Sequence, residues 1–142
     1  METILQASAI GDIETIKRML QDVEDINLVG LVDANGNNAL ILATLKGHEE
    51  ITELLIQNGA YVDHANVEGM DALMFASQNG YEKTFKLLLP RLQNPSKLYL
   101  MDVVFLAFEN GHTRILEILS NFVEERYKRF QILIACSRTL QL

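Results

Sequence analysis

The sequence repeats itself with a period of 33 residues, and this limits the folds open to the chain more than any other feature. Residues 33–58 align without gaps with residues 66–91, and eight of the 26 aligned pairs are identical. Seven of these eight identities are glycine, alanine or leucine, residues whose size matters for packing. A fixed period of this length indicates a stack of similar structural units.

The same pattern extends to both sides of the central pair of units. Gly11 precedes the repeated glycine Gly47 by 36 residues, and Gly111 follows Gly80 by 31 residues. We therefore expect a single domain, 1–142, with four units at approximately 1–32, 33–65, 66–96 and 97–123. Residues 124–142 are interpreted as a C-terminal helical cap or a partial fifth unit.

Each unit reads as two short helices. Three residues at one repeat position are predicted to cap the first helix, namely Asn38, Asp71 and Asp102. Small residues on that helix allow close helix packing, namely Ala43, Ala76 and Ala107. A glycine ends it, because glycine adopts the left-handed conformation at little cost. The second helix carries paired leucines, of which Leu55 and Leu88 are predicted to be core. Turn-rich segments 33–36 and 66–69 are predicted to form hairpins.

These motifs resemble the ankyrin repeat family. The family motif T-P-L-H-x-A is matched by NALILA (38–43), DALMFA (71–76) and DVVFLA (102–107), and GHEEITELLIQNGAYVD (47–63) is similar to the second-helix segment. The resemblance implies an all-α fold, an ankyrin-like helical repeat solenoid with short β-hairpin or turn connections. Leu100 occupies the place of the hairpin glycine in unit four, which allows that hairpin to be missing. Met74, Phe75 and Phe105 are predicted to be core.

The sequence contains no recognisable catalytic or metal-binding motif. It lacks a phosphate-binding loop and any Cys/His cluster with metal-ligand spacing, and Cys136 is its one cysteine. His48 and His112 are interpreted as capping or packing residues at the starts of second helices, and His64 as a solvated hairpin residue. We therefore expect no enzyme activity, no cofactor and no metal.

Charge and hydropathy narrow the class of partner. The net charge of −7 argues against nucleic-acid binding, and no apolar run is long enough to cross a membrane. The charge is uneven, with a net −10 in residues 1–71 and a net +3 in residues 72–142. We expect a cytoplasmic, intracellular protein whose partner is another protein, and delivery into a host cell stays open.

The resemblance also implies where a partner binds, since ankyrin-type proteins commonly use their hairpin tips and the exposed face of the inner helices. The candidate partner-binding residues are Asn35, Asn37, Leu45, Lys46, Val67, Glu68, Met70, Gln78, Asn79, Tyr81, Tyr99, Met101 and Glu109. The expected function is a non-enzymatic protein–protein interaction module. The alternatives are a regulatory or targeting domain of a larger multidomain enzyme, and a stand-alone enzyme inhibitor.

The C-terminal segment is unusually apolar for the end of a solenoid, which normally needs a polar outer face. Residues 130–142 read FQILIACSRTLQL, and Ala135 aligns with Ala107. We predict that residues 124–138 are helical and pack on unit four through Phe130, Leu133, Ile134 or their neighbours.

Overall fold

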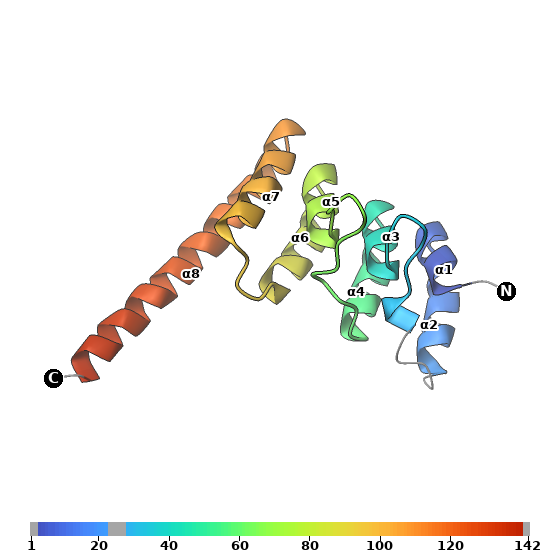
Figure 1. The fold of residues 1–142 in the computed structure, drawn as a ribbon, viewed down its shortest axis with the longest axis horizontal. Coiled ribbons are helices and arrows are strands. Elements are labelled where there is room, and N and C mark those ends of the chain that lie inside the picture. Colours follow the sequence, from blue (N-terminus) through green and yellow to red (C-terminus); the bar gives the residue numbers. More distant parts are fainter. Residues whose placement is uncertain (1–2, 23–27, 141–142) are drawn as a thin grey trace.

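The computed structural model describes residues 3–22 and 28–140, with the side chains described as far as Lys128. The described chain is helical and forms an elongated stack (Figure 1). Its helices are α1 (Ile4–Ile10), α2 (Ile13–Gln21), α3 (Ala39–Leu45), α4 (Glu49–Gln57), α5 (Ala72–Asn79), α6 (Glu82–Leu88), α7 (Lys97–Glu109) and α8 (Thr113–Leu140), with short 3-10 turns at η1 (Leu28–Gly30) and η2 (Leu89–Arg91).

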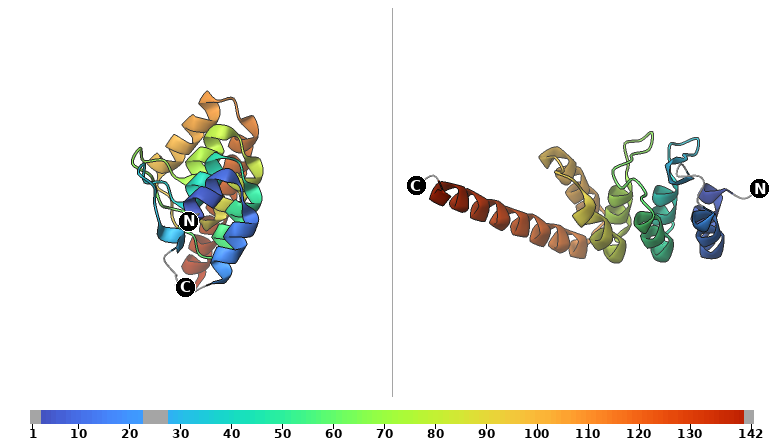
Figure 2. Two further views of the ribbon diagram at one scale, coloured as in Figure 1. Left: turned by 90° about the vertical axis from the view of Figure 1, so that its right-hand side faces the viewer. Right: turned by 90° about the horizontal axis from the view of Figure 1, so that it is seen from below.

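Successive helices pair, and the pairs stack side by side. The odd-numbered helices pack in one layer, α1 on α3, α3 on α5 and α5 on α7, while α2, α4, α6 and α8 pack in a second layer. Figures 1 and 2 show this two-layered row of helix pairs. The predicted all-α helical repeat solenoid is therefore confirmed.

Local chemistry explains where the inner helices begin and end. The side chain of Asn38 accepts a hydrogen bond from the backbone N–H of Ile41 at 2.9 Å, and Asp71 does the same for Met74 at 2.8 Å. Such bonds satisfy amide groups that lack a partner at a helix start. Gly47 and Gly80 follow the inner helices with φ of +75° and +71°, a conformation that glycine adopts cheaply.

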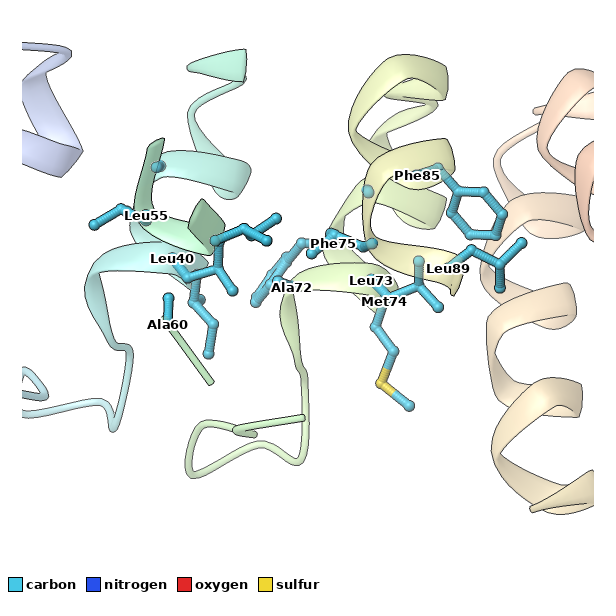
Figure 3. Close-up of a cluster of buried hydrophobic side chains, with 14 of the residues drawn as sticks. Leu40, Leu55, Ala60, Ala72, Leu73, Met74, Phe75, Phe85 and Leu89 are labelled. Carbon is cyan, nitrogen blue, oxygen red and sulfur yellow. The ribbon is translucent and has the colours of Figure 1, made fainter. Parts of the chain in front are cut away.

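The core runs continuously through the stack between the two helical layers. Figure 3 shows buried side chains contributed by α3, α4, α5 and α6. The three repeated alanines are fully buried on the inner helices, and Leu55 and Leu88 are buried on the outer ones, as predicted. Most of these helices have only seven to nine residues, so their stability depends on this packing.

Unit four departs from the repeat pattern at its first helix. Helix α7 begins at Lys97, and Ser96 caps it by accepting a hydrogen bond from the N–H of Tyr99 at 3.1 Å. Asp102 therefore lies inside the helix, and its prediction as a cap is wrong. Within the described residues, isolated β-bridges close hairpins only at Val32–Asn38 and Ala65–Asp71, so unit four has no hairpin of this type.

Helix α8 continues without a break from the outer layer through the C-terminal segment. Residues 124–138 are helical, as predicted, and the predicted unit boundary at residue 123 falls inside this helix. In both Figure 1 and Figure 2 the C-terminal part of α8 projects beyond the stack. The predicted contacts of Phe130, Leu133 and Ile134 concern side chains outside the described ones.

Candidate partner-binding surface

Two loops extend from the same side of the stack, and their tips form the centre of the candidate surface (Figure 2, right). In the first loop the Asp33 carboxylate accepts hydrogen bonds from the backbone N–H groups of Asn35 and Asn37, both at 2.9 Å. In the second loop the Asn66 side chain accepts bonds from the N–H groups of Glu68 and Met70, both at 3.0 Å. One polar side chain therefore holds each tip in a fixed turn.

Three hydrogen bonds tie the two tips to each other. The N–H of Val67 donates to the carbonyl of Asn35 at 3.0 Å, and the Asn66 amide donates to the Asn37 side-chain oxygen at 2.9 Å. His64 Nε2 lies 2.7 Å from the carbonyl oxygen of Gly36 and donates to it. His64 is half-buried in this contact, so its interpretation as a solvated residue is wrong. The tips form one connected surface.

Asn37 belongs to this support and not to the exposed tip. Its side chain is only 7% exposed, because it both donates to Asp33 at 3.1 Å and accepts from Asn66. The prediction that Asn37 is an exposed contact residue is therefore wrong. For the Asp33 carboxyl, desolvation acts to raise the pKa, but the hydrogen bonds from the backbone and side chain of Asn37 and the backbone of Asn35 outweigh it, and the pKa lies below its ordinary value.

Replacing Asn37 with alanine should lower the free energy of unfolding by about 1–3 kcal/mol, the cost of leaving buried polar partners without a hydrogen bond. Chemical denaturation followed by circular dichroism would measure this loss. The matched control is Asn35→Ala, because the Asn35 side chain is exposed and its backbone carbonyl stays in place. That variant should lose less than about 0.5 kcal/mol. Equal losses from the two variants would contradict the assigned role of Asn37.

The exposed part of the tips combines an apolar side chain with polar neighbours. Val67 is 74% exposed, Asn35 and Glu68 are exposed, and Met70 is half-buried. A valine in this position does not contribute to the core. Its backbone N–H is fixed by Asn35, so the side chain is presented from a rigid support.

A second group of candidate residues lies at the C-terminal ends of the inner helices. Lys46, Asn79 and Glu109 are exposed there, whereas Leu45 and Gln78 are half-buried. The carbonyl of Gln78 accepts a hydrogen bond from His112 Nε2 at 2.9 Å. These residues lie at the opposite end of the inner helices from the tips, so they form a second, separate part of the predicted surface.

Tyr81 has a packing role between units. A Cβ atom on Gly47 would lie 3.1 Å from the Tyr81 ring. A Cβ atom on Gly11 would lie 2.8 Å from the His48 ring, and one on Gly80 would lie 2.5 Å from the His112 ring. Each ring therefore covers the glycine of the preceding unit. His48 and His112 also donate to backbone carbonyls of that unit, which supports their interpretation as packing residues. Tyr81 is half-buried, and its prediction as an exposed contact is not supported by this position.

Tyr99 and Met101 lie in two different places on α7. The Tyr99 hydroxyl donates to the Asp71 carboxylate at 2.7 Å, at the side of a cavity of about 450 Å³ that Tyr61, Asp63 and Arg91 also line. Desolvation raises the pKa of the buried Asp71 carboxyl, although the hydrogen bonds from Met74 and Tyr99 act to lower it. Desolvation and the nearby charge of Asp71 raise the pKa of the Tyr99 hydroxyl.

Met101 lies elsewhere on α7, where it lines a groove between α7 and α8.

Several surface residues were not predicted from the sequence. Phe105, predicted to be core, is 59% exposed, and Leu98 and Phe108 are exposed on the same helix. Their spacing with Met101, at 98, 101, 105 and 108, is the signal that places them on one helical face. This spacing can be read from the sequence, but it does not show that no other helix covers this face of α7.

The described residues contain neither a metal-binding cluster nor a membrane-spanning helix. Among the described residues, no group of three or more His, Cys, Asp or Glu side chains is placed to hold a metal ion. Within the same part of the chain, every helix is too short or too polar to cross a bilayer.

Comparison with known proteins identifies similar sequences. A family model described as "Ankyrin repeats (3 copies)" matches residues 4–99. Human transient receptor potential cation channel subfamily A member 1 is 39% identical over 85 residues, which cover 58% of this chain and 7% of that protein. Human short transient receptor potential channel 3 is 33% identical over 124 residues, covering 80% and 13%. The Arabidopsis thaliana E3 ubiquitin-protein ligase XBAT33 is 35% identical over 126 residues, covering 86% and 24%.

The matched part is a small share of each relative. The chain spans less than a quarter of the length of each of these three proteins. What the chain shares with them is a repeat region, and the named activities are those of the much longer proteins.

Proposed function

Because this chain belongs to the ankyrin-repeat family, whose repeats are generally protein-interaction modules, we propose that it is a non-enzymatic module that binds another protein through its hairpin tips. The observation that carries the proposal is the exposed Val67 beside Asn35 and Glu68. An apolar anchor within a polar rim is typical of protein interfaces. The exposed ends of the inner helices, with Lys46, Asn79 and Glu109, extend the proposed contact.

The hydrogen bonds beneath the tips support this proposal energetically. Binding costs free energy when loops must become ordered, and a rigid loop avoids part of that cost. Asp33, Asn37 and Asn66 already hold both tips in place through bonds of 2.9–3.1 Å. A partner that contacts Val67 therefore meets a preformed surface.

Charge favours a partner with a basic surface. Both tips belong to the half of the chain that carries a net charge of −10, and Glu68 is exposed at the second tip. Opposite charges on two proteins speed their encounter and orient them before contact.

The relatives favour one of the two alternative functions. These relatives are a ubiquitin ligase and two channels by name, and in each the matched region is a small part of a longer protein. A regulatory or targeting domain of a larger enzyme is thus the second candidate, ahead of a stand-alone inhibitor. The proposed interaction module is also proposed to act inside the cell.

The double variant Val67→Ser, Glu68→Ala tests the proposed surface. Proteins captured from a cell extract by the unchanged chain and identified by mass spectrometry should be lost with the variant. With a purified partner, calorimetry should show at least about tenfold weaker binding, which corresponds to about 1.4 kcal/mol. The free energy of unfolding should change by less than about 0.5 kcal/mol, because both side chains are exposed.

The matched control is Ile10→Ser, which also removes an exposed apolar side chain but lies in unit one, away from the tips. It should retain the partner. Binding that is equally strong in the tip variant would place the contact elsewhere. Ile10 has the repeat position of Lys46 and Asn79, so loss of binding in the Ile10 variant would show that the contact depends on the ends of the inner helices and not on the tips alone.

A further inference from the structure

Helix α7 is apolar on two opposite faces. Val103 and Ala107 are fully buried, and α7 packs on α5. On the other side, residues spaced three and four apart place Leu98, Met101, Phe105 and Phe108 on one exposed stripe. An apolar face of a helix is normally covered by another element or by a partner. One face of α7 therefore lacks the cover that its composition requires.

The exposed stripe borders a groove between α7 and α8. This groove has a volume of about 650 Å³, and Lys97 is the one charged residue among those that line it. The lining on the α8 side is formed by Leu116, Leu119, Ser120 and Val123. We call the stripe and the groove together the end face, because they close the C-terminal end of the stack (Figure 1).

The opposite end of the stack has a different character. In residues 3–22, which contain α1 and α2, Ile10 is the one exposed large apolar residue, and the other exposed positions are polar: Thr3, Gln6, Glu14, Lys17, Arg18, Gln21 and Asp22. A polar outer face is what a terminal unit of a solenoid needs. The chain therefore has a terminal surface suited to water at one end and an apolar one at the other.

We propose that a second copy of this chain covers the end face, forming a two-fold symmetric dimer through α7 and α8. The area of the end face fits this occupant. Six of its large apolar side chains are 41–72% exposed: Leu98, Met101, Val104, Phe105, Phe108 and Val123. With about 150–250 Å² for a large side chain, they expose roughly 650 Å² in all. Two such faces would bury about 1,300 Å², within the range of stable protein interfaces.

The shape of the end face suits pairing with itself. A two-fold interface brings the same surface patch from both copies together, so that patch must be complementary to itself. Here Met101, Phe105 and Phe108 of the α7 stripe line the α7 side of the groove between α7 and α8. The two-fold axis would place α7 of each copy against the groove of the other.

Charge distribution permits the same contact. The whole chain carries a net charge of −7, but residues 72–142, which contain the end face, carry a net +3. Pairing through this half brings together the weakly charged parts of the two copies and keeps the strongly acidic halves apart, which limits repulsion.

Sedimentation equilibrium of the 142-residue chain over roughly two orders of magnitude in concentration tests the proposal. The mass should rise towards twice the 16.0 kDa of a single chain. Phe108→Glu should raise the dimer dissociation constant at least about thirtyfold, the effect of replacing a large apolar interface residue with a charge that the contact would bury. Circular dichroism checks that the variant is folded, which we expect because Phe108 is 72% exposed.

The matched control is Val67→Glu, which places the same charge on an equally exposed apolar position outside the end face. It should dimerise like the unchanged chain. A chain that stays monomeric at every concentration would overturn the proposal and assign the end face to another occupant, such as a helix of a different protein. A dimer that survives Phe108→Glu, or dissociates with Val67→Glu, would also overturn it.

Discussion

Replacing Phe85 with alanine should lower the free energy of unfolding by about 3–5 kcal/mol, the usual cost of deleting a buried aromatic side chain. Phe85 is fully buried on α6, facing the next helix pair (Figure 3). Helix α6 has seven residues and cannot stand without this packing. Because each unit of a solenoid stabilises its neighbours, unit four should also unfold more easily. Denaturant unfolding followed by far-UV circular dichroism would measure the loss.

The control for this prediction is Phe105→Ala, the same chemical change at a residue that is 59% exposed. Measured at a concentration low enough to keep the chain monomeric, it should cost less than about 0.5 kcal/mol. A large loss there would mean that Phe105 belongs to the core of the single chain. A small loss at Phe85 would show that the space between α6 and unit four collapses without penalty.

The sequence predicts most of the fold because each unit repeats the same local chemistry. Asn38 and Asp71 cap their helices as expected, and the alanines at the repeated position are fully buried. Each of these features depends on residues a few positions apart in the sequence, or on the residue at the equivalent position of the next unit. The period therefore carries the information needed to place both helices and hairpins in units two and three.

In unit four, some predictions made by alignment with units two and three are wrong. The frame places a cap at Asp102, but Ser96 offers an earlier cap, and the apolar run after it continues as one helix from Lys97. Phe105 occupies the repeat position of the buried residues Ile41 and Met74 and is nevertheless exposed. Periodicity shows which residues share a helix face, but it cannot show whether a neighbouring element covers that face.

The candidate surface was predictable in outline and less so in its residues. The family resemblance pointed to the tips, where Val67 and Glu68 are indeed exposed. Asn37 follows the exposed tip residue Asn35 closely in the sequence, yet Asn37 is buried. Its side chain accepts a hydrogen bond from Asn66, 29 residues later in the chain. Such a contact between units depends on how the hairpins stack, which local sequence does not encode.

Replacing Gly80 with alanine should lower the free energy of unfolding by about 2–5 kcal/mol, for two additive reasons. The backbone at Gly80 has a φ of +71°, which costs a residue with a Cβ atom about 1–2 kcal/mol. The new Cβ would also lie 2.5 Å from His112 Nδ1, a closeness that forces the ring to move and adds about 1–3 kcal/mol. Denaturant unfolding of the variant would measure the sum.

Gly69→Ala separates the two causes. Gly69 has a similar φ of +77°, but no atom lies within 4 Å of the position that its Cβ would take. This variant should lose only the backbone part, about 1–2 kcal/mol. His112 cannot simply rotate away, because its Nε2 is bonded to the Gln78 carbonyl at 2.9 Å. Adding His112→Ala to Gly80→Ala removes the ring, so the double variant should lose less than the sum of the two single losses. Strictly additive losses would show that the ring at position 112 does not require a glycine in the preceding unit.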